Sequence, residues 1–150
     1  MKVTREQASK NRDRVLDAAG RLFRERGFDG IGVADLMKSA GLTHGGFYGQ
    51  FASKEELMAE AFARSIDHAV DGWSALAERT DGNALAAVMK AYLSKRHRDN
   101  PGEGCFLAAL GADTARQGSL LRNAVTEGTR KLLDLFTSFA PGRIKAIKRE

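Results

Sequence analysis

Residues 32–54 have the sequence GVADLMKSAGLTHGGFYGQFASK, in which apolar residues recur at helical spacing on both sides of a central glycine. The spacing predicts a short helix at about Val33–Ser39 and a second one at Thr43–Phe51. Between them, Gly41 can adopt the positive φ that a tight turn requires, and Thr43 stands where an N-cap is needed. Two short helices joined by such a turn are typical of a helix-turn-helix motif.

The second helix of a helix-turn-helix motif places its N-terminal residues in the major groove of DNA. Those positions hold His44, Gly45 and Gly46, whose side chains are flat or absent. Free amides and the positive end of the dipole at the start of this helix favour contact with a phosphate, and Tyr48 and Lys54 are placed for phosphates as well. Double-stranded DNA is therefore the expected partner, although the spacing alone fits a plain helical corner equally well.

The remaining sequence predicts helices and no sheet. Residues 5–26 form an amphipathic pattern that ends at Gly27, and the capping box Ser53–Glu56 begins a long helix that ends near Arg79. Further helices are expected at about 84–98, 105–116, 119–140 and, as a first turn only, 143–150. We therefore expect an all-α fold with a DNA-binding domain at 1–55, containing the helix-turn-helix at 32–51, and an all-α domain at 56–150.

Composition narrows the class of protein further. The chain has 150 residues and a formal net charge of +5, and residues 1–55 carry ten Lys/Arg against seven Asp/Glu, an excess of +3 that suits a polyanionic partner. The absence of an apolar leader or span predicts a cytoplasmic protein without a membrane contact. No paired carboxylates, nucleophile–base pair or phosphate loop points to an enzyme. The three histidines lie 24 and 29 residues apart, so no metal or cofactor is expected.

Two runs carry a family resemblance, NRDRVLDAAGRLFRERGF at 11–28 and ADLMKSAGLTHGGFYGQFASKEEL at 34–57. Over residues 9–69 the chain resembles the TetR family of transcriptional regulators. The resemblance implies that the N-terminal helices bind DNA, and that an all-α C-terminal domain binds a small effector and forms a homodimer. Two subunits would place their recognition helices in successive major grooves of a pseudo-palindromic operator. Most members are repressors, and effector binding releases the DNA by a population shift.

The resemblance also assigns roles to individual residues of the motif. Phosphate contacts fall to Thr43, Tyr48 and Lys54, and base-reading positions to His44, Gly45 and Gly46, of which only His44 can donate a hydrogen bond to guanine. Gln50 stands where the family often has His, and either bonds a phosphate or is solvated. Because glycine costs about 1 kcal/mol per residue in a helix interior, Gly45, Gly46 and Gly49 predict a recognition helix that becomes ordered on DNA.

The C-terminal part departs from the family pattern. The family continues through two more long helices that form the dimer interface, whereas this sequence ends at Glu150, where the first of them would begin. We therefore expect an incomplete effector and dimerisation domain. The alternatives to a working repressor are a truncated paralogue that pairs with a full-length regulator, a remnant that does not bind DNA, and a small-molecule carrier.

Six residues are candidates for effector binding or sensing. An effector cavity between the later helices could be lined by aromatic and large apolar side chains, which equally suit a plain core: Phe62, Trp73, Tyr92, Phe106 and Leu110. Cys105 is the only cysteine and stands at an expected helix N-terminus, where a thiolate is favoured. It is a candidate redox sensor, and the alternative is a small buried apolar residue.

Overall fold

The computed structural model describes residues 4–140, and this part of the chain contains helices and turns but no β-strand. The helical elements are α1 (Arg5–Arg26), α2 (Val33–Ser39), the 3₁₀ turn η1 (His44–Gly46), α3 (Lys54–Glu78), α4 (Ala84–Tyr92), α5 (Lys95–Asp99), the 3₁₀ turn η2 (Pro101–Glu103), α6 (Phe106–Thr114) and α7 (Ser119–Phe139). The all-α prediction is confirmed. The helix expected at 143–150 lies outside the described residues. None of the described helices is long and apolar enough to cross a membrane.

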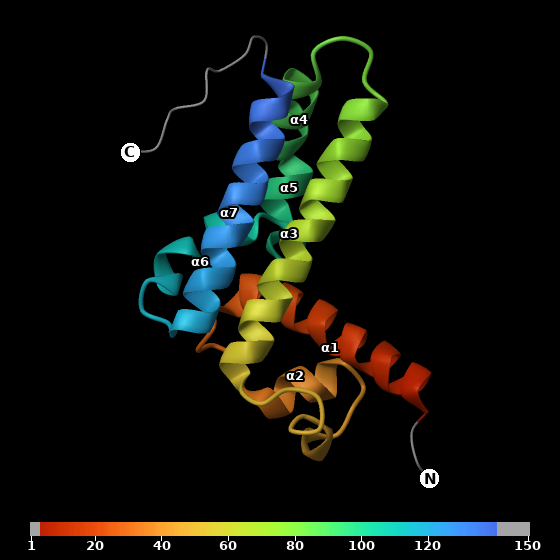
Figure 1. The fold of residues 1–150 in the computed structure, drawn as a ribbon, viewed down its shortest axis with the longest axis vertical. Helices are drawn as coiled ribbons and strands as arrows, with labels where there is room; N and C mark the ends of the chain where they lie inside the picture. The colour runs from red at the N-terminus through yellow and green to blue at the C-terminus, as the bar shows by residue number, and fades with distance from the viewer. Residues whose placement is uncertain (1–3, 141–150) are drawn as a thin grey trace.

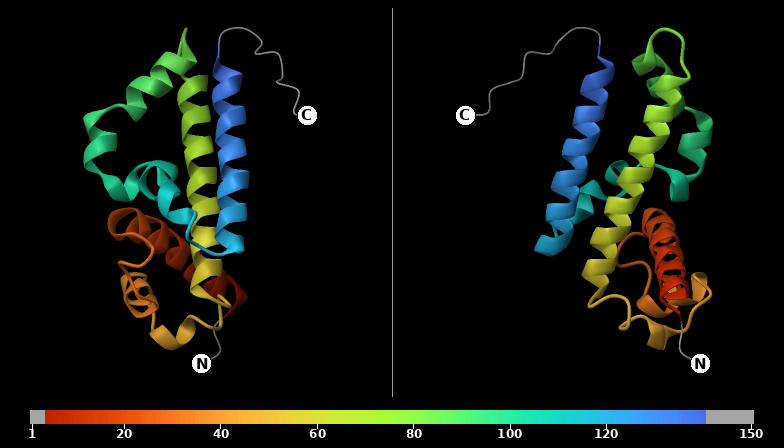
Figure 2. Two further views of the ribbon diagram at one scale, coloured as in Figure 1. Left: turned by 90° about the vertical axis from the view of Figure 1, so that its left-hand side faces the viewer. Right: turned by 45° about the vertical axis from the view of Figure 1, so that its right-hand side comes forward.

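Helix α3 connects the two ends of the molecule. Its 25 residues span about 37 Å at 1.5 Å per residue. In Figure 1, α1, α2 and the loop that follows α2 lie around its N-terminal end, and α4 to α7 lie along the rest of it. Figures 1 and 2 both show α7 beside α3 and running in the same direction. The ion pair between Lys131 and Asp67, at 2.6 Å, joins the middle parts of these two helices.

The first turn of α3 fixes the start of α7. The Ser53 hydroxyl accepts from the Glu56 amide at 3.0 Å, as predicted, although the Glu56 carboxylate receives the amide of Ala52 rather than that of Ser53. Glu55 accepts from the amide of Leu120 at 3.0 Å, which supplies the cap that Gly118 at the N-cap of α7 lacks. A methyl group at Gly118 would lie 2.2 Å from the Glu55 carboxylate, so a larger residue there would displace this side chain from its position at the start of α7.

One hydrophobic core passes through both parts of the chain. Side chains of α1, α2, the loop after α2, α3, α6 and α7 belong to it, including the fully buried Phe23, Leu36, Phe47, Phe62 and Leu121. The core continues across the boundary expected near residue 55, because side chains of α1 and α2 pack in it together with those of α3, α6 and α7. The N-terminal part is therefore packed directly on the C-terminal part.

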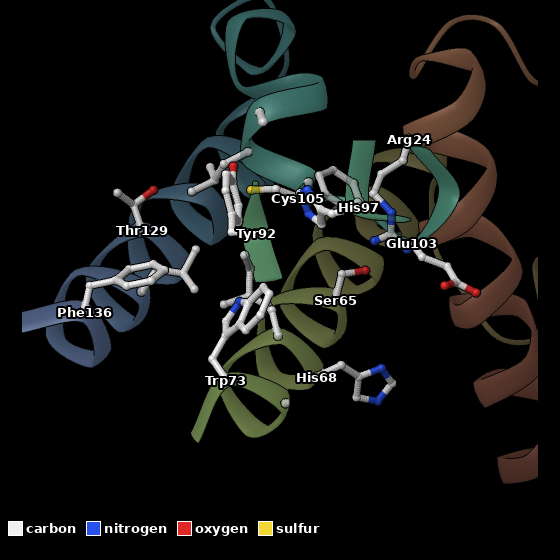
Figure 3. Close-up of a pocket in the computed structure, with 18 of the residues that line it drawn as sticks. Arg24, Ser65, His68, Trp73, Tyr92, His97, Glu103, Cys105, Thr129 and Phe136 are labelled. Carbon is white, nitrogen blue, oxygen red and sulfur yellow. The ribbon is translucent and has the colours of Figure 1, made fainter. Parts of the chain in front are cut away.

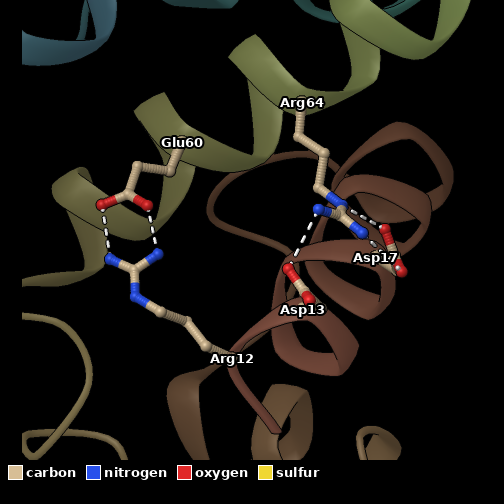
Figure 4. A network of polar contacts seen from close by, with 5 residues as sticks. All are labelled: Arg12, Asp13, Asp17, Glu60 and Arg64. Atoms are coloured by element: carbon tan, nitrogen blue, oxygen red, sulfur yellow. Dashed lines mark hydrogen bonds and ion pairs between the residues drawn. The ribbon is translucent and has the colours of Figure 1, made fainter. Parts of the chain in front are cut away.

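Two arginines clamp α1 to α3 (Figure 4). Arg12 forms a bidentate pair with Glu60, and Arg64 bonds Asp17 at 2.6 Å and Asp13 at 3.0 Å. These side chains are partly exposed, so each pair contributes no more than about 1 kcal/mol. Their spacing along both helices fixes the angle and register of α1 rather than the overall stability.

The predicted helix at 84–98 is wrong as a single element. It divides into α4 and α5, because the Ser94 hydroxyl accepts from the His97 amide at 3.2 Å and caps a new helix. Leu93, just before this break, is 75% exposed, so no core contact holds the chain in a continuous helix.

Gly128 marks the closest approach of α3 and α7, and it provides a test of this packing. A methyl group there would lie 2.5 Å from Phe62 Cε1 and 3.0 Å from Ile66 Cγ1. Gly128→Ala should therefore lower the free energy of unfolding by about 1–3 kcal/mol through overpacking. The matched control is Gly111→Ala in α6, where nothing lies within 4 Å and a gain of about 0.4–1 kcal/mol is expected. Urea unfolding measures both, and equal stability of the two variants would contradict this packing.

Candidate functional site

The turn of the predicted helix-turn-helix motif is present. Gly41 has φ +70°, the conformation for which glycine was expected. The amide of Leu42 donates to the carbonyl of Met37 at 2.9 Å and closes the turn after α2. Leu36 and Met37 are fully buried and attach α2 to α1 and α3 through the core.

The second helix of the motif differs from the prediction. Thr43–Phe51 is not an α-helix: only His44–Gly46 form a 3₁₀ turn, and turns follow as far as Gln50. Three glycines within five residues, Gly45, Gly46 and Gly49, explain this, since each weakens an α-helix by about 1 kcal/mol. Thr43 occupies the N-cap position but makes no capping hydrogen bond, so the expected amides and dipole of an α-helix N-terminus are not in place.

Core contacts, rather than helical hydrogen bonds, hold this segment. Phe47 and Phe51 are 1% and 2% exposed, and their rings stack with centroids 5.6 Å apart. The Arg12 guanidinium lies over the Phe51 ring at 4.4 Å from its centroid. The segment is therefore tied to α1 even though most of it lies outside a regular helix.

Four of the seven predicted DNA-contacting residues form one exposed surface. Thr43, His44, Gly45 and Tyr48 are all exposed, and Tyr48 is 71% exposed although its ring is aromatic. The rings of His44 and Tyr48 meet edge to face with centroids 6.4 Å apart. We call these four residues the outer face of the motif. Gly46 is half-buried and lies against Met37 rather than on this face.

The other two residues point inward. Lys54 Nζ donates to the carbonyls of Phe28 at 2.6 Å and Ile31 at 2.8 Å, so its ammonium group holds the loop after α1. Gln50 Nε2 donates to the Gly46 carbonyl at 3.3 Å, and its Oε1 is buried without a hydrogen-bond partner among the described residues. A phosphate contact by either residue stays a prediction, and it would require the side chain to leave these positions.

A pocket of about 890 Å³ lies between α3, α4, α6 and α7 (Figure 3). Its wall is mainly apolar and aromatic, and it includes Trp73, Met89, Tyr92, His97, Phe106, Leu132, Leu133 and Phe136. The volume lies within the usual range for small-molecule sites. Trp73, Tyr92 and Phe106, three of the five residues expected to line an effector cavity, are part of the wall.

The other two residues expected in the cavity belong to the core. Phe62 is fully buried and meets Phe106 edge to face with centroids 5.0 Å apart, and Leu110 is 3% exposed. Neither lines the pocket. An effector contact by these two residues stays a prediction, and α1 and α7 cover the side of α3 that carries Phe62. Sequence reasoning missed Arg24, His97 and Phe136, since a charge or a lone aromatic at helical spacing carries no signal for a pocket.

Cys105 lies in the pocket wall at the N-cap of α6 and is half-buried. The neighbouring Cys105 thiol, together with burial, raises the pKa of Tyr92 to about 12. The ring of His97 lies 4.5 Å from that of Tyr92, centroid to centroid. The thiol therefore shares a polar corner of the pocket with two side chains that can hydrogen bond. Over residues 4–140, no cluster of His, Cys, Asp and Glu could hold a metal ion.

Arg24 crosses from the last turn of α1 to this pocket. Its Nε donates to the Gly102 carbonyl at 2.8 Å, and Nη2 bonds the same oxygen. Burial lowers the pKa of Arg24, while nearby Cys105, Glu103 and Glu25 oppose this shift. Neither carboxylate lies within ion-pair distance of the guanidinium, and no other described residue pairs with it.

Comparisons with known sequences agree with this architecture. Residues 15–61 match the family model described as bacterial regulatory proteins, tetR family. The repressor NemR of Escherichia coli K12 is 26% identical over 129 residues, which is 84% of this chain and 65% of NemR. The uncharacterized regulator YfiR of Bacillus subtilis is 30% identical over 95 residues, 63% of this chain and 44% of that protein. This chain thus spans about two thirds of NemR and less than half of YfiR. These relatives are named as transcriptional regulators and not as enzymes.

Solved structures share the fold. The crystal structure of reduced E. coli NemR has a TM-score of 0.73 at 25% identity, covering 86% of this chain and 68% of that one. A regulator from Cytophaga hutchinsonii has the same TM-score at 19% identity, covering 92% and 71%, and supports the fold alone. The family match, the related sequences and the shared fold agree with one another, and residues 15–61 carry the N-terminal domain of the TetR family of bacterial regulatory proteins.

Proposed function

We propose that this protein is a sequence-specific DNA-binding transcriptional repressor that a small-molecule effector releases from its operator. The observation that carries the proposal is the outer face of the motif, Thr43, His44, Gly45 and Tyr48, held in place by the buried Phe47 and Phe51. Groups that donate and accept hydrogen bonds line this face, as base and phosphate contacts require. Because operator DNA is its target, we place its action in the cytoplasm.

The effector part of the proposal rests on α3. This helix begins at the loop that follows the motif and also lines the pocket with Trp73 and Ser65. A ligand that prefers one position of α3 would change the population of DNA-binding conformations by its differential affinity. We further propose that two copies bind a pseudo-palindromic operator as a homodimer, in the manner of other helix-turn-helix proteins.

The decisive experiment is an anisotropy titration of DNA from upstream of the gene, with sedimentation to count the chains bound. We expect two chains per site and an affinity about 10³-fold or more above that for random DNA at the same salt concentration. His44→Ala should weaken the free energy of binding to the upstream DNA by about 1–3 kcal/mol and change that of binding to random DNA little. Asn123→Ala is the control, since Asn123 is an exposed polar residue on α7.

Equal affinity of the wild-type protein for both DNAs would refute the proposed function as a sequence-specific repressor. Equal losses of His44→Ala on both DNAs would refute base reading by this residue.

Lys54 separates a structural role from a DNA-contacting one. Lys54→Met leaves the carbonyls of Phe28 and Ile31 without their donor and should lower the free energy of unfolding by about 1–3 kcal/mol. If Lys54 contacts a phosphate instead, the Lys54→Met variant should bind all DNA more weakly, and the salt dependence of its binding should fall by about one unit of slope. Urea unfolding and DNA titration at several salt concentrations measure both. Lys38→Met on α2, an exposed lysine, is the control.

Cys105 gives the pocket a second mode of control, and we propose that it senses oxidants. Hydrogen peroxide would convert the thiolate to a sulfenic acid, with the second peroxide oxygen leaving as hydroxide. This change places a larger polar group next to Tyr92 in the pocket wall and should lower DNA affinity at least about tenfold, by about 1.4 kcal/mol. Cys105→Ser should not respond, and it removes the only thiol.

Mass spectrometry should confirm oxidation before DNA binding is measured. Full oxidation without loss of DNA affinity, or the same loss in Cys105→Ser, would show that Cys105 is a structural residue.

A further inference from the structure

Arg24 lines the pocket and has no ion-pair partner among the described residues, although the more distant Glu103 and Glu25 act on its charge. Arg24 lines the wall beside an apolar and aromatic surface, and Figure 3 shows its side chain reaching there from α1. Its Nε and Nη2 share a single neutral acceptor, the Gly102 carbonyl. For Nη1, the described residues provide no hydrogen-bond acceptor. The guanidinium lies 5.7 Å from the centroid of the Phe106 ring, so its surroundings are apolar on that side.

The nearby carboxylates do not fill this role. Glu25 is bonded to Arg21 at 3.4 Å on the exposed side of α1, and Glu103 is exposed. Neither comes within 4 Å of Arg24. A partly buried cation without a counter-ion is unfavourable, and an anion supplied from outside the protein would stabilise it. The arrangement therefore favours a ligand with a negative charge at this end of the pocket.

The rest of the wall sets the nature of the ligand body. Trp73, Phe106 and Phe136 offer aromatic surface, and Leu132 and Met89 offer aliphatic surface, around a volume of about 890 Å³. Such a wall gains most from burying apolar or aromatic carbon. Glu103 also lines the pocket, but because it is exposed its charge is better screened by water than that of Arg24.

We propose that the pocket binds a small organic anion, with an aromatic or aliphatic body against Trp73 and Phe106 and one carboxylate, sulfonate or phosphate group paired with Arg24. This inference rests on the proposed effector role of the pocket and names the chemical class of the effector. The anionic group meets Nη1 and competes with the Gly102 carbonyl for the rest of the guanidinium. Arg24 belongs to α1, so a ligand in this position contacts the N-terminal part of the protein directly.

A matched pair of fluorescent probes tests the proposal on the full chain. 8-Anilinonaphthalene-1-sulfonate carries the negative charge, and N-phenyl-1-naphthylamine has a similar aromatic body without it. Energy transfer from Trp73, the only tryptophan, reports binding next to it. Arg24→Gln removes the charge and keeps a donor for the Gly102 carbonyl. It should bind the sulfonate at least tenfold more weakly and the neutral probe within twofold of wild type.

Two further variants complete the design. Arg24→Lys keeps the charge without the planar fork and should restore most of the sulfonate affinity. Arg26→Gln removes an exposed charge from the same turn of α1 and should change neither probe. If Arg24→Gln fails to fold, competition on wild type decides: decanoate should displace the sulfonate at a concentration at least tenfold below that of decanol.

Equal weakening of both probes in Arg24→Gln, or equal displacement by decanoate and decanol, would overturn the proposal. These titrations contain no DNA, so a protein that binds the anion but no operator would refute the proposed repressor and leave this inference standing. Release of operator DNA by decanoate in wild type, and not in Arg24→Gln, would support both.

Discussion

The first turn of α3 holds three separate parts of the protein together. Its residues Lys54, Glu55 and Glu56 reach in three directions: to the loop after α1, to the N-terminus of α7 and to the end of the motif. All three bonds involve a charged group and a backbone partner, which makes them stronger and more directional than bonds between neutral groups. The motif, α1 and α7 are thus positioned by the same five or six ångströms of helix. A change in this turn would reach all of them at once.

The sequence predicted the elements whose ends depend on local chemistry. Gly27 and Gly41 have the positive φ expected of them, and Ser53 caps α3. The prediction failed where helix propensity and the apolar pattern disagreed. In the segment after Thr43, Phe47 and Phe51 lie at helical spacing and are buried. The glycines of this segment have low helix propensity, so it does not form an α-helix. The low helix propensity of the glycines therefore decided the backbone conformation, and the apolar pattern decided which side chains are buried.

In the candidate site, the sequence predicted the positions that the motif determines but not those determined by partners far away in the chain. The exposed residues His44 and Tyr48 follow from the motif alone. The inward position of Lys54 does not, because its two acceptors lie 26 and 23 residues earlier in the chain. Arg24 is a stronger case, since its partner carbonyl belongs to Gly102, 78 residues away. From sequence alone, a charged residue on an amphipathic helix is predicted to be exposed to solvent, and only the fold shows what covers it.

The way α1 is held suggests how a state of the pocket can reach the DNA-binding motif. Toward its N-terminal end, α1 is clamped to α3 by Arg12 and by the two carboxylates that bind Arg64. At its C-terminal end, Arg24 bonds Gly102, on a loop that also forms part of the pocket wall, and Lys54 of α3 bonds the carbonyl of Phe28 just beyond the helix. In these contacts the N-terminal part of α1 is thus held by α3 alone, whereas its C-terminal end contacts both α3 and the pocket loop. Under the proposed function, a ligand that shifts this loop relative to α3 would shift α1, which carries the core contacts of α2 and Phe51. Coupling of this kind needs only a small displacement, because packed interfaces switch between discrete arrangements rather than deform continuously.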